Sequence, residues 1–205
     1  MVRKKKKADP APRRTKAQML EAALDILAEH GEDALRIDVL CKRLGVTKGS
    51  FYHHFSSRED LSRQLLEYWV EEYTNRYIEL SSRAGSPMEQ CRALDNLALD
   101  GDAGLGAAFR SWALRDPLAR EYQERVDAVR LDHLKRLYAQ MIGDEAEAER
   151  LAVMDYAMFI GSRQIMPRLT HEALRRLPGH WLTLLESHYG MSARPGTQTG
   201  ATDPA

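Results

Sequence analysis

One stretch of the chain, residues 36–60, reads RIDVLCKRLGVTKGSFYHHFSSRED, with two short helical patterns on either side of a glycine. Its apolar residues recur at the spacing of two packed helices, and they are Leu40, Leu44, Val46 and Phe51. Gly45 stands at the turn, where a left-handed backbone conformation suits glycine. The pattern predicts a helix-turn-helix, with one helix over about 37–44 and a second over about 47–54.

The second of these helices is unusually polar at its exposed positions. It opens with small, polar or cationic residues, which are Thr47, Lys48, Gly49 and Ser50. Lys donates to guanine O6 and N7 or to phosphate, and Gly lets the backbone approach closely, so such residues fit a DNA major groove. Three aromatic or imidazole residues follow, Tyr52, His53 and His54. The alternative is a solvated helix face, but a hairpin that served only for packing would not need this composition.

The segment GVTKGSFYHHF followed by SSREDL resembles the recognition helix and the next helix of the TetR family of one-component regulators. The segment TKAQMLEAALDILAEHGEDAL resembles the first helix of that family, and the whole resemblance covers about residues 15–62. It implies an all-α fold of about nine helices. An N-terminal three-helix helix-turn-helix DNA-binding unit would precede a helical effector-binding and dimerisation domain.

The resemblance also assigns individual roles. Tyr52 and His54 match positions that bond phosphate, and His53 matches an aromatic position that packs on bases or sugars. The expected DNA-binding residues are Arg36, Thr47, Lys48, Gly49, Ser50, Tyr52, His53, His54 and Arg58. Arg58 would pair with phosphate. Arg36 departs from the family pattern, in which Thr or Ser caps the helix; Arg reaches a phosphate but cannot cap in the same way.

Charge is unevenly distributed along the chain. Residues 1–16 hold eight Lys or Arg against one Asp, a net charge of +7, so the remainder of this neutral chain carries −7. A basic arm joined to an acidic body indicates a polyanionic partner at one end only. A solvated tail is the alternative, but beside a helix-turn-helix we expect contact with DNA phosphates.

Caps and breakers divide the chain into helices. Thr15-x-x-Gln18 is a capping-box pattern, Gly31 stops the first helix, and Ser56 or Ser57 begins the fourth. Later helices are expected over about 87–99, 104–115, 117–141, 145–166 and 171–189, the last kinked or broken at Pro178–Gly179. The predicted domains are a disordered basic arm (1–14), the helix-turn-helix domain (15–56), the effector-binding and dimerisation domain (57–190) and a disordered tail (191–205).

Aromatic residues are dense on the later helices. In a TetR-like body the corresponding helices enclose an effector cavity, although aromatic residues at helical spacing are also ordinary core. The expected effector-binding residues are Trp69, Tyr73, Phe109, Arg110, Trp112, Phe159 and Arg163, with Gln164 as a further polar anchor. This lining indicates an apolar or aromatic ligand, and Arg110 or Arg163 would favour an anionic group on it.

The stretch of residues 151–160 is apolar over more than the one face that a core helix needs. A fully buried central helix is one explanation. We favour the other, in which this helix and the last one form half of a two-fold homodimer interface. The expected interface residues are Val153, Ala157, Ile160, Trp181, Leu184 and Leu185.

Several classes of protein are disfavoured. The sequence contains no Gly-rich phosphate loop, G-x-S-x-G or HExxH motif, so an enzyme is not expected. Cys41 and Cys91 lack metal-ligand spacing and His53–His54 point apart, so no cofactor or metal is expected. No apolar run is long enough to span a membrane and no signal peptide is apparent, which favours the cytoplasm.

The function that these observations favour is a ligand-responsive transcriptional regulator, a repressor released from its operator by a small molecule. Its expected partners are double-stranded DNA with a palindromic operator, a small-molecule effector and a second copy of the chain. Two alternatives remain open: a DNA-binding architectural or co-regulator protein without an effector, and a helical enzyme that uses the body cavity.

Overall fold

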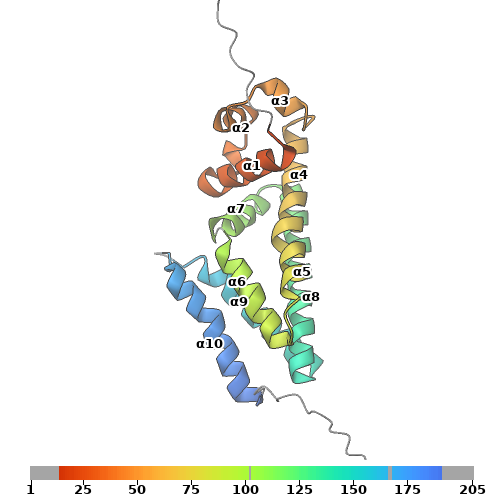
Figure 1. The fold of residues 1–205 in the computed structure, drawn as a ribbon, viewed down its shortest axis with the longest axis vertical. Helices are drawn as coiled ribbons and strands as arrows, with labels where there is room; N and C mark the ends of the chain where they lie inside the picture. The colour runs from red at the N-terminus through yellow and green to blue at the C-terminus, as the bar shows by residue number, and fades with distance from the viewer. Residues whose placement is uncertain (1–13, 102, 166–167, 191–205) are drawn as a thin grey trace, which may run out of the picture. The chain divides into compact units, whose positions relative to one another are not determined.

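The computed structural model describes residues 14–101, 103–165 and 168–190, and every regular element in these ranges is a helix (Figure 1). The basic arm up to residue 13 and the tail from residue 191 lie outside the described residues. The chain forms two compact units, each with its own hydrophobic core. Of the described residues, the first unit comprises 14–79, 100–101 and 103–130, and the second comprises 80–99, 131–165 and 168–190.

The first unit holds the N-terminal helices and one later helix. They are α1 (Lys16–His30), α2 (Ile37–Leu44), α3 (Lys48–Tyr52), α4 (Arg58–Val70) and α7 (Ala103–Ala113). The second unit holds α6 (Pro87–Asp100) up to Leu99, together with α9 (Glu145–Ser162) and α10 (His171–Tyr189). The helices α5 (Arg76–Ser81) and α8 (Pro117–Ile142) have residues in both units. This division differs from the predicted domain boundary after residue 56.

The predicted helix caps are confirmed where they are local. The Thr15 hydroxyl accepts from the Gln18 backbone N–H, and the Gln18 side chain accepts from the Thr15 N–H, which completes the capping box. Gly31 ends α1 with a φ of 75°, a value that favours glycine. Ser57, rather than Ser56, caps α4 through the Asp60 N–H.

Two boundaries of the predicted helices are wrong. The recognition helix α3 is shorter than 47–54, because Thr47 is its cap and the chain leaves the helix after Tyr52. Helix α9 ends at Ser162, before residue 166. Helix α10 was expected to be kinked or broken at Pro178–Gly179, and it is continuous through Pro178, so there is no break.

Between α4 and α5 the chain forms a π-helical segment, Glu71–Asn75, which the sequence did not predict. Arg130 of α8 stabilises it from outside. Its Nη2 donates to the Tyr73 carbonyl at 2.9 Å and to the Thr74 hydroxyl at 2.9 Å, while its Nε donates to the same hydroxyl at 3.1 Å. Thr74 is buried. A π-helical turn leaves carbonyl groups without their usual partner, and here a long-range arginine supplies one.

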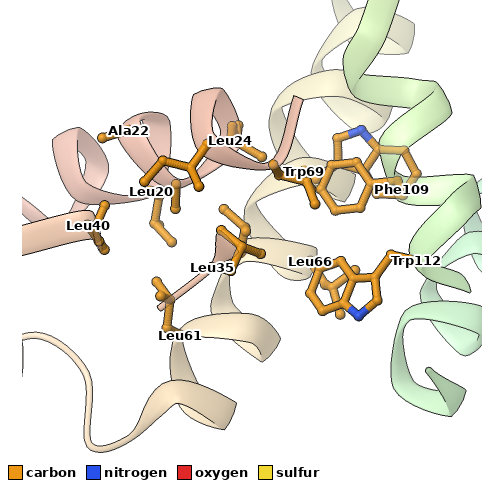
Figure 2. Close-up of a cluster of buried hydrophobic side chains, with 14 of the residues drawn as sticks. Leu20, Ala22, Leu24, Leu35, Leu40, Leu61, Leu66, Trp69, Phe109 and Trp112 are labelled. Atoms are coloured by element: carbon orange, nitrogen blue, oxygen red, sulfur yellow. The ribbon is translucent and has the colours of Figure 1, made fainter. Parts of the chain in front are cut away.

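The first unit has a core of aliphatic and aromatic side chains from α1, α2, α4 and α7. In Figure 2, Trp69 of α4 lies over Phe109 of α7, and Trp112 lies beside them. The Trp69 and Phe109 rings are stacked, with centroids 4.0 Å apart and planes 16° apart. The same view labels five leucines of this core, which are Leu20, Leu24, Leu35, Leu61 and Leu66.

The second unit has a core built from α6, α8, α9 and α10. Its polar centre is the hydroxyl of Tyr138, which donates to Asp155 Oδ2 at 2.7 Å and accepts from Trp181 Nε1 at 2.9 Å. Tyr138 is fully buried, so these bonds satisfy a group that would otherwise destabilise the core. In the described residues, no helix combines the length and apolar character that crossing a bilayer requires.

Candidate nucleic-acid interface and ligand pocket

The helix-turn-helix is held by the residues that its pattern predicted. Leu40, Cys41 and Phe51 are buried, and Leu44 and Val46 pack against the same core. Gly45 ends α2 in the left-handed region, with φ 66° and ψ 32°. The turn is closed by the Val46 N–H, which donates to the Cys41 carbonyl at 3.0 Å. Backbone geometry and packing together therefore fix the direction in which α3 leaves the turn.

A bidentate ion pair holds α2 against α1. Arg43 Nη1 and Nη2 each lie 2.7 Å from an oxygen of Glu29, and Nη2 lies 3.3 Å from Asp25. The arginine lowers the pKa of Glu29 through its hydrogen bond, while the carboxylate raises the pKa of Arg43. Two parallel bonds define an orientation more sharply than one charge contact does.

Helix α3 presents its polar residues to solvent. The side chains of Thr47, Lys48, Tyr52 and His53 are exposed, and Tyr52 is 56% exposed. Thr47 also caps the helix by accepting from the Ser50 N–H at 3.2 Å. Phe51 points into the core, so one side of this short helix holds it in place while the other is free for a partner.

The remaining predicted DNA contacts surround this helix. The His54 ring Nε2 lies 3.0 Å from the Arg14 carbonyl oxygen. Arg58 is exposed, and its Nε donates to the Leu35 carbonyl at 3.0 Å, which positions its guanidinium. Arg36 occupies the cap position of α2 without making a side-chain cap, as expected, and pairs with Asp38 at 3.5 Å. Whether these residues contact DNA stays a prediction.

The predicted effector residues divide between the two units. Trp69, Phe109 and Trp112 are buried in the first core, Tyr73 packs against it, and Arg110 pairs with Asp127 of α8 at 2.7 Å and 3.0 Å. Within the first unit these aromatic side chains fill the hydrophobic core. This packing does not support a role for them in lining a ligand pocket.

Phe159 and Arg163 instead line a hollow in the second unit, formed by α6, α9 and α10. The lining residues are Asp95, Leu99, Asp155, Met158, Phe159, Ser162, Arg163, Leu174, Leu177 and Pro178. Sequence reasoning missed both carboxylates. One signal was present, since Asp155 is the only charged residue in the apolar run LAVMDYAMFI.

The predicted dimer residues differ in exposure. Val153, Ala157 and Leu184 are exposed, whereas Leu185 is buried in the core of its own unit and Trp181 is bonded to Tyr138. Met154, which was not predicted, is 55% exposed on α9. Leu151, Ala152 and Tyr156 are buried on the same helix, so α9 is not surrounded by its own unit.

Comparison with known proteins bears on the N-terminal helices most directly. Residues 19–65 match the family model described as bacterial regulatory proteins, tetR family. The transcriptional repressor KstR2 of Mycolicibacterium smegmatis is 30% identical over 87 residues, 42% of this chain and 42% of the relative. The transcriptional regulator AcuR of Cereibacter sphaeroides is 31% identical over 105 residues, 50% of this chain and 47% of the relative. The chain thus spans less than half the length of these relatives.

Solved structures extend the similarity in fold over most of the chain. A TetR-family transcriptional regulator from Streptomyces coelicolor superimposes with a TM-score of 0.70 at 18% identity, covering 85% of this chain and 89% of that one. The regulator FadR of Bacillus subtilis gives a TM-score of 0.63 at 18% identity, covering 83% and 97%. The chain is therefore similar to the TetR family of bacterial regulatory proteins over residues 19–65, and its fold is similar to that of these solved regulators over most of its length.

Proposed function

We propose that the protein is a ligand-responsive, sequence-specific regulator of transcription, a repressor that a small molecule releases from its operator. One observation carries this proposal: α3 is anchored by Phe51 and exposes Lys48, Tyr52 and His53 on its outer side. A helix so presented fits a major groove, where Lys reaches base edges or phosphate. As a DNA-binding protein it would act in the cytoplasm, and we propose no catalytic activity.

Named relatives support both parts of this proposal, which are repression and response to a ligand. KstR2 is named as a transcriptional repressor. FadR of Bacillus subtilis was solved with stearoyl-CoA, and a regulator from Saccharomonospora viridis was solved with choline. These ligands are chemically unlike, so they support ligand response in this fold without indicating which molecule the present chain binds.

We propose that the functional form is a homodimer joined through α9 and α10. The exposed apolar residues Val153, Met154 and Leu184 lie on these two helices. A two-fold pair would present two copies of α3, and a palindromic operator has the matching symmetry. Leu185 and Trp181 would then support the interface from behind rather than form its surface.

We propose that effector binding changes the position of α4 and therefore the spacing of the two reading helices. A ligand shifts such an equilibrium only through different affinities for the two states. Coupling on the order of 1–3 kcal/mol would weaken operator binding by roughly 5- to 150-fold, and operator would weaken effector binding by the same factor.

Selection of bound fragments from a random DNA pool tests the proposal as a whole. The expected product is an enriched sequence made of two inverted half-sites, spaced about one helical turn or a multiple of it. A pool that stays random after selection, or that yields fragments bound no better than bulk DNA, would contradict sequence-specific regulation.

A further inference from the structure

The hollow in the second unit brings together two carboxylates from different helices. Asp95 comes from α6 and Asp155 from α9, and both line the same space. Counting the part open to solvent, the hollow measures about 300 Å³, but the room that it leaves between its walls is small, on the order of one water molecule. A compact charged group fits this room, and a larger body would extend into the part open to solvent.

The carboxylates are incompletely paired. Asp155 is 8% exposed, and Tyr138 donates to its Oδ2 at 2.7 Å; among the described residues nothing hydrogen-bonds its Oδ1. The Asp95 side chain is half-buried and has no hydrogen bond or ion pair from the described residues. Asp155 is largely shielded from water, in a position where a carboxylate interacts with a charged donor more strongly than it does in bulk water, so a donor from outside the chain would be bound favourably.

The one guanidinium in the lining is already engaged. Arg163 Nη1 donates to the Phe159 carbonyl at 3.0 Å, and Nη2 donates to the Ala98 carbonyl at 3.2 Å. Its charged end lies 3.8 Å from the centroid of the Phe159 ring. These contacts hold Arg163 as a structural bridge between α9 and α6, which leaves little of it for the anionic ligand group that the sequence suggested.

The remaining walls are mainly apolar. Met158 and Phe159 of α9 face the hollow with three residues of α10, Leu174, Leu177 and Pro178. An aromatic ring and a thioether are favourable neighbours for a cation and for an apolar body alike. The two carboxylates and the apolar walls therefore favour one class of ligand, a positive group carried on an apolar body.

We propose that this hollow binds a small organic cation, a protonated amine on an apolar body, with its nitrogen between Asp95 and Asp155. The inference deepens the proposed function, since this ligand would be the effector. The ammonium group donates to Asp155 Oδ1 and to the Asp95 carboxylate. Its apolar part lies against Phe159 and the side chains of α10.

The titration of the pair agrees with this placement. Burial, followed by the negative charge of Asp155, raises the pKa of Asp95 to about 8, against a smaller opposing effect of Arg163 and Arg92. Burial also raises the pKa of Asp155, which the Tyr138 hydrogen bond lowers in part. Cys91 and Tyr138 face the same cluster with raised pKa values and stay protonated. Near neutral pH the pair therefore keeps a proton, which a bound cation replaces.

Calorimetric titration of the full chain with three probes of matched size tests the proposal. Benzylamine is a cation, benzyl alcohol is neutral and benzoate is an anion. We expect benzylamine to bind roughly tenfold or more tightly than benzyl alcohol, and benzoate not to bind. Its affinity should rise by about tenfold per pH unit up to about pH 8 and then level off, because binding releases one proton.

Two variants locate the site. Asp95→Asn and Asp155→Asn each should weaken benzylamine binding by roughly tenfold or more, and Asp95→Asn should abolish the pH dependence. Asp132→Asn, which changes an exposed aspartate on α8, should have no effect. Thermal unfolding of each variant confirms that it is folded. The proposal is overturned if benzylamine does not bind, if benzyl alcohol or benzoate binds as well, or if Asp95→Asn binds benzylamine with wild-type affinity.

Failure of the cation site and failure of the proposed function can be told apart, because the benzylamine titrations contain no DNA. If benzylamine binds as described and leaves affinity for the selected operator unchanged, the cation site stands and its role as the effector site is wrong. If binding of benzylamine weakens operator binding, both inferences are supported together.

Discussion

The Nε2 atom of His54 lies 3.0 Å from the main-chain carbonyl oxygen of Arg14. The contact joins the residue just after the reading helix to the first described residue of the chain. The basic residues at positions 3–7 and 13 precede Arg14 in sequence, so the chain runs from the basic arm directly into this contact. We therefore expect the arm to contribute to DNA affinity.

Deleting residues 1–12 removes the five basic residues at positions 3–7 and should weaken binding to all DNA sequences. The slope of log affinity against log salt concentration should decrease by about 0.9 for each phosphate that the shortened protein no longer neutralises. His54→Ala should weaken operator binding more in the full chain than in the shortened one, because its role is partly to place the arm. Fluorescence anisotropy across a salt series measures both effects. An unchanged slope after the deletion would show that the arm does not bind phosphates.

The stacked pair Trp69 and Phe109 makes a separate prediction about the first core. Phe109 is 1% exposed, so Phe109→Ala should destabilise the protein by about 3–5 kcal/mol. Leu114→Ala, at the 78% exposed Leu114, is the control and should change little. Urea unfolding followed by circular dichroism gives both values. A Phe109→Ala protein of wild-type stability would show that the ring fills no core space and would favour a ligand lining at this position.

The sequence predicted the parts of the fold that short-range interactions determine. The capping box at Thr15 and the left-handed Gly45 are set within a few residues, and the structure confirms both. The inward position of Phe51 followed from helical spacing in the same way.

Features that depend on distant residues were not predictable. The π-helical segment Glu71–Asn75 is held by Arg130, and nothing within the segment marks it. Helical spacing indicates that Phe109 faces inward but not whether another ring or a ligand meets it. Asp155 accepts a hydrogen bond from Tyr138 and lines the hollow together with Asp95. Both partners lie on other helices, so the sequence pattern around Asp155 could not predict these contacts.

The carboxylate Asp95 makes stability depend on pH. Its pKa rises from 3.8 to about 8 on folding, so between these values the folded protein binds more protons than the unfolded chain. Stability should therefore fall as pH rises through this range, by up to about 1.4 kcal/mol per pH unit for one proton, and less because the group is partly exposed. Asp95→Asn should flatten the dependence, whereas Asp132→Asn should not. Melting temperatures measured from about pH 5 to about pH 9 decide between these outcomes.

The proposed dimer predicts different consequences for two adjacent leucines. Leu184 is 51% exposed, so Leu184→Glu should leave the protomer folded and prevent dimerisation. Leu185 is 4% exposed, so Leu185→Glu should unfold the protein by burying an unpaired charge. Analytical ultracentrifugation and circular dichroism separate the two effects. A wild-type chain that sediments as a monomer at micromolar concentration is incompatible with the proposed dimer.

Operator affinity of variants in the exposed face of α3 tests the account most directly. Lys48→Ala and Tyr52→Phe alter exposed groups, so both proteins should keep wild-type melting temperatures. Each should bind the selected operator more weakly, with a loss of about 1–3 kcal/mol if Lys48 reads a base. Lys135→Ala, which removes a charge from α8, should bind as wild type does. If Lys48→Ala and Tyr52→Phe both retain wild-type operator affinity, α3 does not read DNA through this face.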